Sequence, residues 1–333
     1  MSSSPRSDVP PPTARDVDAA ADRIAGRAVR TPLLESAILN RRLDARVLVK
    51  AEPLQFTGSF KFRGAYNRLC QLSEPQRQAG VVAYSSGNHA QGVAAAAGIL
   101  GIPATIVMPA DAPAIKLDNT RGYGAEVVTY ERSAEDRAAI ARDIAARRNA
   151  VLVPPFDDPD IIAGQGTAGR EMARQAAERG AELDMMVCPV GGGGLIAGCS
   201  IALKAANERV EIYGVEPEAF DDTRRSLARG DRVAVTASAG SICDALLAPM
   251  PGEMTFAINR TTLSGVLTVS DDEAMAAMAV AFRDLKLVVE AGGAVALAAV
   301  LSRKIDVAGR SVGVICSGGN VDPVLFAEAL SRS

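Results

Sequence analysis

The sequence predicts an α/β protein whose open sheets are built from strands that alternate with helices. Apolar runs typical of buried strands, such as 81–83 and 105–108, are each followed by a helical pattern. The run 185–188 leads through four glycines into another apolar helix, which is the order of elements that builds a parallel sheet. With 333 residues and an apolar fraction of 48%, the chain is long enough for two modest domains with substantial cores.

The N-terminal part has less regular elements. Residues 1–14 are rich in serine and proline and are expected to form a disordered tail. Thr13 and Asp16 have the spacing of a capping box, so a short amphipathic helix is expected to follow and to end near Pro32. Residues 46–50 are predicted to form a strand that leads to the segment around Lys61.

The most regular alternation lies between residues 80 and 155, which we predict to be a small domain. It is expected to contain strands at 81–83, 105–108, 126–130 and 151–153, and helices that end near 100, begin near 113 and cover 134–148. Residues 15–79 and 156–333 are predicted to form a larger domain. Its later strands are expected at 185–188, 211–215 and 311–316, and its helices at 160–179, 194–206, 271–285, 293–302 and the C-terminal end.

The segment 56–66 carries a lysine, Lys61, between two phenylalanines, Phe60 and Phe62. A lysine in an apolar, partly dry site loses much of its preference for the charged form, and a neutral amine can react with a carbonyl group. The preceding residues, 57–59, suit a tight turn that begins a helix. On these residues alone, a lysine that points into water remains an open interpretation.

Polar or glycine-rich turns follow three of the predicted strands. Residues 85–89 lie between a strand and an alanine-rich helix, where hydroxyls and helix N-terminal amides make an anion site, and His89 in this turn is the only histidine. Residues 191–194 are all glycine and begin the next helix, so the backbone can approach a phosphate closely. Ser317 follows the strand at 311–316. A reactive lysine, a phosphate cradle, an anion turn and a hydroxyl together describe a pyridoxal phosphate site.

The chain resembles the fold-type II pyridoxal-phosphate-dependent enzymes, specifically the serine/threonine dehydratase and serine racemase family, over roughly residues 15–330. The motifs that carry the resemblance are residues 59–65, 85–89, 163–167, 191–194 and 317–320. The resemblance implies the tryptophan synthase β-like architecture of two open-sheet domains, with pyridoxal 5'-phosphate as cofactor. It also implies a homodimer.

The resemblance implies a role for each motif. Lys61, with Phe60 beside it, would hold the cofactor and then act as the base on the Cα proton of the substrate. The phosphate would be bound by Gly191, Gly192, Gly193 and Gly194, the ring hydroxyl by Asn88 and the ring nitrogen by Ser317. The substrate carboxylate would be received by Ser85, Ser86, Gly87, Asn88 and His89. Ser86 is also a candidate catalytic residue, because the matching serine of the racemases is their second acid–base group.

Three further features bear on metal binding and specificity. Glu216 and Asp222 match, by resemblance, a divalent-cation site of racemase-like members, which Mg²⁺ or another divalent cation would suit; a solvated acidic loop is the alternative. Residues 290–293 read Glu-Ala-Gly-Gly where the family often has Glu-Pro-Ser-Gly. Phe156 stands where mammalian-type racemases have a smaller polar residue. These two departures leave the substrate's side chain open.

Two rival functions fit parts of the sequence. Gly192, Gly194 and Ala197 match a dinucleotide fingerprint, and Glu216 ends the next strand. A nicotinamide enzyme, however, has no use for the Lys61 segment or the 85–89 turn. A protein that binds pyridoxal without reacting would not need the lysine and the hydroxyls together. The combination therefore favours an enzyme.

Composition restricts the partners and the compartment. The net charge of −3 disfavours nucleic acid and anionic membranes as partners. Five cysteines without metal-ligand spacing indicate a reducing environment, and the chain lacks the apolar core of a signal peptide or a membrane span, so a cytoplasmic location is expected. No regulatory domain is expected after the last helix, which argues against that form of feedback control.

We predict an L-threonine/L-serine ammonia-lyase that uses pyridoxal 5'-phosphate to release a 2-oxo acid and ammonia by α,β-elimination of water. The expected partner is therefore a small β-hydroxy amino acid. Two alternatives stay open at this point: a dehydratase of another β-hydroxy amino acid such as 3-hydroxyaspartate, and a serine racemase.

Overall fold

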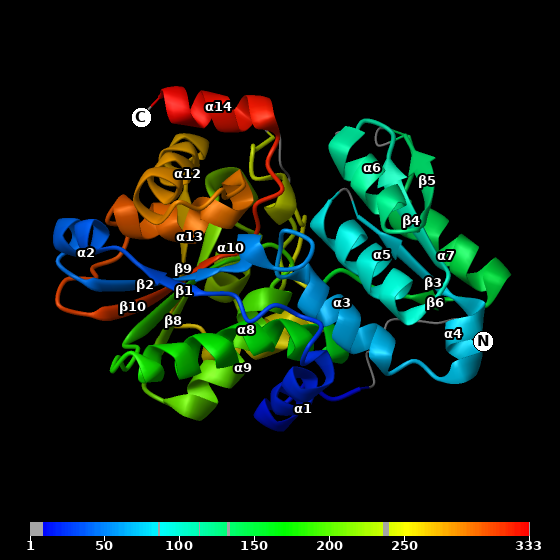
Figure 1. Ribbon diagram of the computed structural model, residues 1–333, viewed down its shortest axis with the longest axis horizontal. Coiled ribbons are helices and arrows are strands. Elements are labelled where there is room, and N and C mark those ends of the chain that lie inside the picture. Colours follow the sequence, from blue (N-terminus) through cyan, green and yellow to red (C-terminus); the bar gives the residue numbers. More distant parts are fainter. Residues whose placement is uncertain (1–8, 86, 113, 132–133, 236–239, 333) are drawn as a thin grey trace.

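Two sheets with helices on both faces form the framework of the protein, shown in Figure 1 as a computed structural model. The structure describes residues 9–85, 87–112, 114–131, 134–235 and 240–332. The α/β class expected from the alternating strand and helix patterns is confirmed. None of the helices in the described ranges is long and apolar enough to cross a membrane.

The larger sheet has six strands, and all neighbouring pairs are parallel except β1 with β2. In spatial order its strands are β1 (Leu33–Glu35), β2 (Arg46–Ala51), β10 (Ser311–Cys316), β7 (Met185–Pro189), β8 (Glu211–Pro217) and β9 (Gly265–Val269). The central strands are apolar along almost their whole length, as expected for a parallel sheet that is buried on both faces.

Helices cover both faces of this sheet (Figure 1). One face packs against α12 (Asp271–Leu285) and α13 (Ala291–Leu301), and the other against α8 (Pro159–Glu178) and α9 (Gly194–Ala206). The remaining helical elements around the sheet are α1 (Ala14–Ile24), α2 (Ala37–Leu43), η1 (Glu52–Leu54), η2 (Glu218–Phe220), α10 (Asp222–Arg229), η3 (Asp244–Leu246), α11 (Glu253–Thr262) and α14 (Pro323–Ser331).

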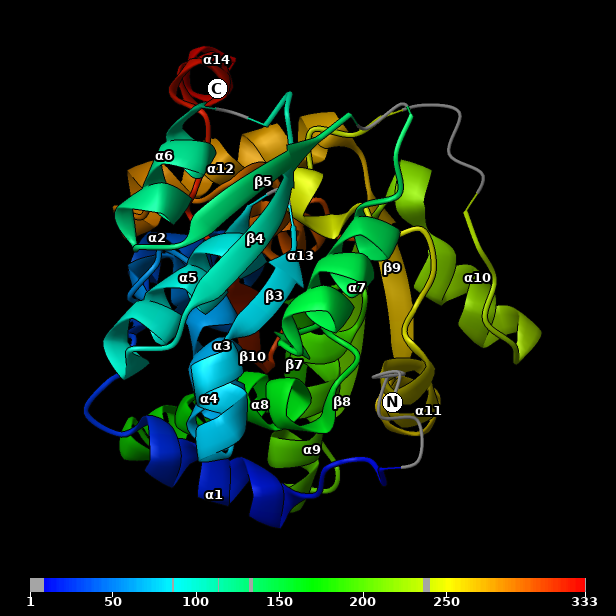
Figure 2. The same ribbon diagram turned by 90° about the vertical axis from the view of Figure 1, so that its right-hand side faces the viewer.

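The smaller sheet has four parallel strands, in the order β5 (Glu126–Tyr130), β4 (Ala104–Pro109), β3 (Val81–Tyr84) and β6 (Val151–Leu152). Figure 2 views this part of the molecule from the front. Alternate residues of β3 point to opposite faces: Ala83 packs with α5 (Asn88–Leu100), and Val82 packs with α7 (Arg137–Arg148). The other helices of this part are α4 (Glu74–Ala79) and α6 (Ala114–Gly122).

The helix that carries Lys61 joins the two parts. Helix α3 (Lys61–Cys70) packs against α5 beside the small sheet and against α8 below the large one. Its N-terminus therefore lies where the two sheets face each other. The boundaries expected for two domains, with residues 80–155 as the small one, stay a prediction, although the four-stranded sheet is formed within that range.

Most elements expected from the sequence are confirmed, including both capping boxes, at Thr13 and Ser270. The helix expected from residue 134 begins at Arg137, because the Asp136 side chain accepts a hydrogen bond from the N–H of Ala138 and caps the helix there. The sequence did not predict β1, β9, α2, α4, α10 or α11. Most of the expected tail, residues 1–8, lies outside the described residues.

Glycines allow α8 and α9 to cross closely, which fixes the start of α9. A Cβ atom at Gly198 would lie 2.2 Å from the carbonyl oxygen of Ile162 and 2.6 Å from the nitrogen of Gly166. Real Cβ atoms do not approach backbone so closely, so one of the two helices would have to move.

We expect Gly198→Ala to lower the free energy of unfolding by about 1–3 kcal/mol, because the added methyl group overpacks the crossing. Urea unfolding of the full chain measures it. The matched control is Gly122→Ala, at a helical glycine whose added Cβ would meet no atom within 4 Å. The control should leave stability unchanged or raise it by up to about 1 kcal/mol. Equal effects of the two substitutions would contradict a tight α8–α9 crossing.

Candidate functional site

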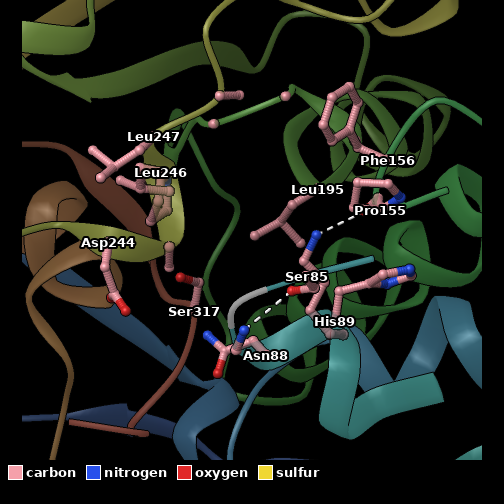
Figure 3. A pocket seen from close by; sticks show the side chains of 18 of the residues that line it. Ser85, Asn88, His89, Pro155, Phe156, Leu195, Asp244, Leu246, Leu247 and Ser317 are labelled. Carbon is pink, nitrogen blue, oxygen red and sulfur yellow. Dashed lines mark hydrogen bonds between the residues drawn. The ribbon is translucent and has the colours of Figure 1, made fainter. Parts of the chain in front are cut away.

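A cavity of about 550 Å³ lies between the two sheets, at the carboxyl ends of β3, β7 and β10. In open α/β sheets this is where ligands bind. Figure 3 shows Pro155 and Phe156 on one side of the cavity, Asp244, Leu246 and Leu247 on the other, and Ser317 between them. The first residue of α3, the turn after β3 and the glycine loop before α9 complete the lining.

Lys61 reaches this cavity from the N-terminus of α3, and Phe60 lines the cavity beside it. Its Nζ donates a hydrogen bond of 2.7 Å to the carbonyl oxygen of Pro155 and lies 5.2 Å from the centre of the Phe60 ring. Burial lowers the pKa of the Lys61 ammonium to about 8. A useful fraction of this amine is therefore neutral near pH 7 and able to attack a carbonyl.

The turn after β3 presents backbone and side-chain donors to the cavity. Ser85, Gly87 and Asn88 all line it, and the Ser85 hydroxyl accepts a hydrogen bond of 3.2 Å from the N–H of Gly87. Helix α5 begins at Asn88, so its first N–H groups lie at this turn and suit an anion. Ser86, expected to bind substrate and to act in catalysis, lies outside the described residues.

His89 is buried and neutral. Its Nε2 lies 3.0 Å from the carbonyl oxygen of Val153 and must donate, because a carbonyl oxygen only accepts. Burial and the nearby charge of Lys61 lower the pKa of the imidazole to about 3. Its Nδ1 is buried without a partner among the described residues, and in this tautomer it carries a lone pair rather than a proton.

The glycine loop follows β7 and begins α9. Gly191, Gly192, Gly193 and Gly194 all line the cavity, and Gly193 has a left-handed φ of 88° that favours glycine. The ring of Phe156 packs on the loop, so that a Cβ at Gly192 would lie 2.2 Å from it. Among the described residues, none accepts a hydrogen bond from the N–H groups of Gly192, Gly193 or Gly194.

Ser317 lies in the cavity at the end of β10. Its carbonyl oxygen accepts a hydrogen bond of 3.1 Å from the N–H of Phe60, and Gly318 forms a β-bridge with Ser59. These contacts connect the start of α3 to the end of β10. The structure therefore brings Ser317 and Lys61, which are far apart in the sequence, to one cavity.

The orientation of the Asn88 amide is fixed by two hydrogen bonds. Its Oδ1 accepts one of 2.8 Å from Asn320, and its Nδ2 donates one of 2.5 Å to Glu290. Burial, together with the charge of Asp244, raises the pKa of Glu290 to about 7. An amide nitrogen has two N–H groups, so Asn88 keeps a second donor for a ligand.

Two cationic side chains in the cavity were not singled out by the sequence. Lys116 from α6 is buried and forms an ion pair with Asp244 from η3, which bridges the two sides of the cavity. Arg137, the first residue of α7, lies with its guanidinium carbon 5.8 Å from the centre of the Tyr84 ring. Nothing in their local sequence distinguishes these residues from other helix lysines and arginines; only the fold places them here.

The acidic pair expected to bind a metal does not line this cavity. Glu216 at the end of β8 accepts hydrogen bonds of 2.9 Å from the N–H groups of Thr223 and Arg224. Both carboxylate oxygens of Asp222 are buried without a partner among the described residues. Among all the residues that the structure describes, no group of three or more His, Cys, Asp or Glu side chains is suited to bind a metal. A cation here would need backbone or water oxygens besides the two carboxylates.

The cavity fits pyridoxal phosphate on three observations. The Lys61 amine, made less basic by burial, can react with the aldehyde. The glycine loop offers unpaired N–H groups at the start of α9, and it has no space for a side chain at Gly192 or Gly193, which suits a phosphate. Ser317 supplies a hydroxyl for the ring nitrogen.

Comparisons with known proteins agree with this fit. Residues 24–318 match the protein family described as "Pyridoxal-phosphate dependent enzyme". Two curated relatives are L-threo-3-hydroxyaspartate ammonia-lyases. The protein from Saccharomyces cerevisiae is 43% identical, over 96% of this chain and 97% of its own length. The protein from a Pseudomonas species is 46% identical, over 95% of this chain and 97% of its own length.

A solved structure described as a threonine deaminase from "T.th." has a similar fold. It superposes with a TM-score of 0.89 at 45% sequence identity and covers 93% of this chain and 99% of its own. The similarity therefore extends over both sheets and includes the cavity between them.

We expect the imidazole of His89 to stay neutral between pH 8 and about pH 4, because burial lowers its pKa to about 3. As His89 is the only histidine, ¹H–¹⁵N spectra of the imidazole report it without ambiguity. The unfolded chain takes up this proton near its ordinary pKa of 6.5. Any stability that neutral burial of His89 gives is therefore complete above pH 6.5 and declines toward pH 3. An imidazole that titrates near pH 6.5 in the folded protein would contradict this geometry.

Proposed function

Because the chain belongs to the pyridoxal-phosphate-dependent enzymes of fold type II, we propose that it is an ammonia-lyase that eliminates water from a small β-hydroxy amino acid. The observation that carries the proposal is the meeting of three groups in one cavity: the Lys61 amine, the glycine loop and the Ser317 hydroxyl. The products are a 2-oxo acid and ammonia.

The cofactor is held by groups from both ends of the cavity. We propose that Lys61 binds it covalently, that the N–H groups of Gly191–Gly194 bind its phosphate, and that Asn88 donates to its ring hydroxyl oxygen through the second N–H of its amide. When bound, pyridoxal phosphate supplies an electron sink that makes the Cα–H bond of the amino acid acidic.

The proton at Cα is taken by Lys61. Its amine carries no carboxylate partner in the described contacts and donates only to Pro155, and burial lowers its pKa to about 8, so that a fraction of it is neutral near pH 7 and able to accept a proton. The resulting ammonium can then protonate the hydroxyl that leaves Cβ as water. Hydrolysis of the dehydrated amino acid gives the 2-oxo acid and ammonia.

Ser317 favours elimination over other outcomes. A hydroxyl donates a hydrogen bond to an unprotonated ring nitrogen, whereas a carboxylate would keep that nitrogen protonated and strengthen the electron sink. With Ser317 at the ring nitrogen, the bound cofactor would be a weaker electron sink, which would suit prompt loss of a leaving group at Cβ. This supports a lyase that acts on a β-hydroxy substrate.

The substrate carboxylate binds at the turn after β3. We propose that Ser85, Gly87 and the first N–H groups of α5 receive it. The ring of His89 donates to Val153 and has only a lone pair left, so we propose that His89 contributes its backbone and the shape of the turn rather than a ring N–H.

One cation of the cavity favours a substrate with a second carboxylate. Arg137 lines the space beside the proposed carboxylate turn, whereas Lys116 is already paired with Asp244; the methyl group of threonine would not pair with Arg137. We therefore propose L-threo-3-hydroxyaspartate as the preferred substrate, with L-threonine and L-serine as slower ones. The two relatives that bear this substrate in their names support the choice.

Several finer expectations stay proposals. Serine racemisation would need a second acid–base group, for which Ser86 is the candidate. Glu216 and Asp222 remain a candidate divalent-cation site. Their carboxylates are buried next to each other, so they do not belong to a solvated loop, and a bound cation would compensate their charges. A homodimer is proposed by resemblance alone. A cytoplasmic location agrees with the free state of all five cysteines.

We expect Lys61→Ala to abolish release of 2-oxo acid, because the variant loses both the covalent anchor and the base. Borohydride reduction of the unmutated holoenzyme should fix the cofactor to the peptide that contains Lys61, as mass spectrometry detects. Lys204→Ala is the control, because the Lys204 amine donates a hydrogen bond to the carbonyl oxygen of Glu208 and does not line the cavity. Full activity of Lys61→Ala would remove Lys61 from the mechanism.

The substrate class is tested with Arg137→Met. We expect kcat/KM for L-threo-3-hydroxyaspartate to fall about tenfold to a hundredfold, since a charge-assisted hydrogen bond to the second carboxylate is lost. The values for L-serine and L-threonine should change by less than about threefold.

The control for this experiment is Arg142→Met, on the same helix, whose exposed side chain pairs with Asp136. The rate of keto acid release gives kcat/KM for each of the three substrates, and chiral analysis of residual serine measures racemisation. An equal loss for all substrates in Arg137→Met would contradict a role in binding the second carboxylate. Serine racemisation faster than pyruvate release by the unmutated enzyme would replace the lyase by an isomerase.

A further inference from the structure

Helix α11, which the sequence did not predict, packs beside α9 and contacts the glycine loop, and none of its described residues lines the cavity. Two of its buried polar side chains contact carbonyl oxygens of the loop. We propose that Thr255 and Asn259 are positioning residues that aim the N–H groups of the loop at the phosphate of the cofactor. The proposal rests on the phosphate cradle assigned above.

Thr255 makes the shorter of two hydrogen bonds that hold the peptide between Gly192 and Gly193. Its fully buried hydroxyl donates one of 2.7 Å to the carbonyl oxygen of Gly192, and the N–H of Gly252 lies 3.5 Å from the same oxygen. A trans peptide is planar, so its C=O and N–H point in opposite directions. With the Gly192 oxygen held toward α11, the N–H of Gly193 points away from that helix. The cavity lies on that side.

Asn259, one turn further along α11, acts on the next peptide. Its Nδ2 lies 3.4 Å from the carbonyl oxygen of Gly193, which also accepts a hydrogen bond of 3.0 Å from the N–H of Ala197 in α9. Asn259 therefore adds to the hold that α9 already has on this carbonyl, and the N–H of Gly194 points the opposite way. Gly193 has a φ of 88°, and a Cβ there would lie 2.8 Å from the same Nδ2. The left-handed glycine thus allows the loop to approach both side chains closely.

Asp157 holds α11 in this place. Its carboxylate accepts hydrogen bonds of 2.9, 3.0 and 3.2 Å from the N–H groups of Glu253, Met254 and Thr255, at the positive end of the helix. Gly252 permits this approach, because a Cβ there would lie 2.3 Å from an oxygen of Asp157. Asp157 follows Phe156, whose ring packs on the loop. The 156–157 segment therefore supports the cradle from two sides.

These contacts act on the phosphate subsite alone. Thr255 and Asn259 do not line the cavity and have no contact with Lys61, Asn88 or Ser317 among the described residues. Loss of either hydrogen bond should weaken the grip on the phosphate and leave the ring subsite unchanged. A general loss of structure would instead weaken every contact with the cofactor.

The test compares pyridoxal 5'-phosphate with pyridoxal, which lacks the phosphate. The full chain is freed of cofactor by dialysis first against hydroxylamine, which releases the aldehyde from Lys61, and then against buffer. It is titrated with each compound, and binding is followed by visible absorbance. We expect Thr255→Val to weaken binding of pyridoxal 5'-phosphate about tenfold and to leave pyridoxal binding within about twofold. Thr255→Ser, which keeps the hydroxyl, should restore most of the affinity.

Thr261→Val is the matched control, because its hydroxyl bonds to a carbonyl of the same helix and does not reach the loop. It should leave both affinities unchanged. Unchanged affinity for pyridoxal 5'-phosphate in Thr255→Val, or an equal loss for both compounds, would overturn the proposal. The titration measures binding of the cofactor and not turnover of a substrate. A negative result here would therefore leave the proposed lyase reaction standing, and a failure to detect that reaction would leave this result standing.

Discussion

A buried ionic network beneath Lys61 is the constraint on which the site depends. The Arg63 guanidinium is fully buried and pairs with Glu52 and Glu171. Lys50 joins the network through Glu171 and the carbonyl oxygen of Thr31. Removing one partner of such a network leaves a buried charge uncompensated, which costs about 3–5 kcal/mol. Since Arg63 lies two residues after Lys61, the network fixes the first turn of α3 against β2, η1 and α8.

Two lysines of the same chain show how partners decide chemistry. Burial lowers the pKa of Lys50, but Glu52 and Glu171 oppose that shift and favour the charged form. Lys61 has burial alone as a cause, and its amine bonds to a neutral carbonyl. Lys50 is therefore held as a structural cation, while Lys61 is available as a nucleophile and base. The fold separates the two roles by the placement of carboxylates rather than by the lysines themselves.

The sequence was sufficient for what local patterns encode. The alternation of strands and helices and both capping boxes depend on neighbours in the chain, as do the glycine loop and the position of Lys61 at a helix start. Lys116, Arg137 and Thr255 gain their significance only when the fold brings α6 and α7 to the cavity and α11 to the outer side of the glycine loop. The sequence also left Asp157 unmarked, because the N–H groups that it binds lie about a hundred residues away along the chain.

The contacts across the cavity have a further consequence for catalysis. Asn88 and Lys116, both next to the small sheet, reach Glu290 and Asp244, both next to the large one. The charge of Asp244 raises the pKa of Glu290 and that of Lys116 lowers it, so the charge states of these groups are coupled to one another and to the hydrogen bond with Asn88. A substrate carboxylate that paired with Lys116 would compete with Asp244 and change the balance at Glu290, and through it the hold on Asn88. Substrate charge is thereby coupled to the residue proposed to contact the cofactor ring.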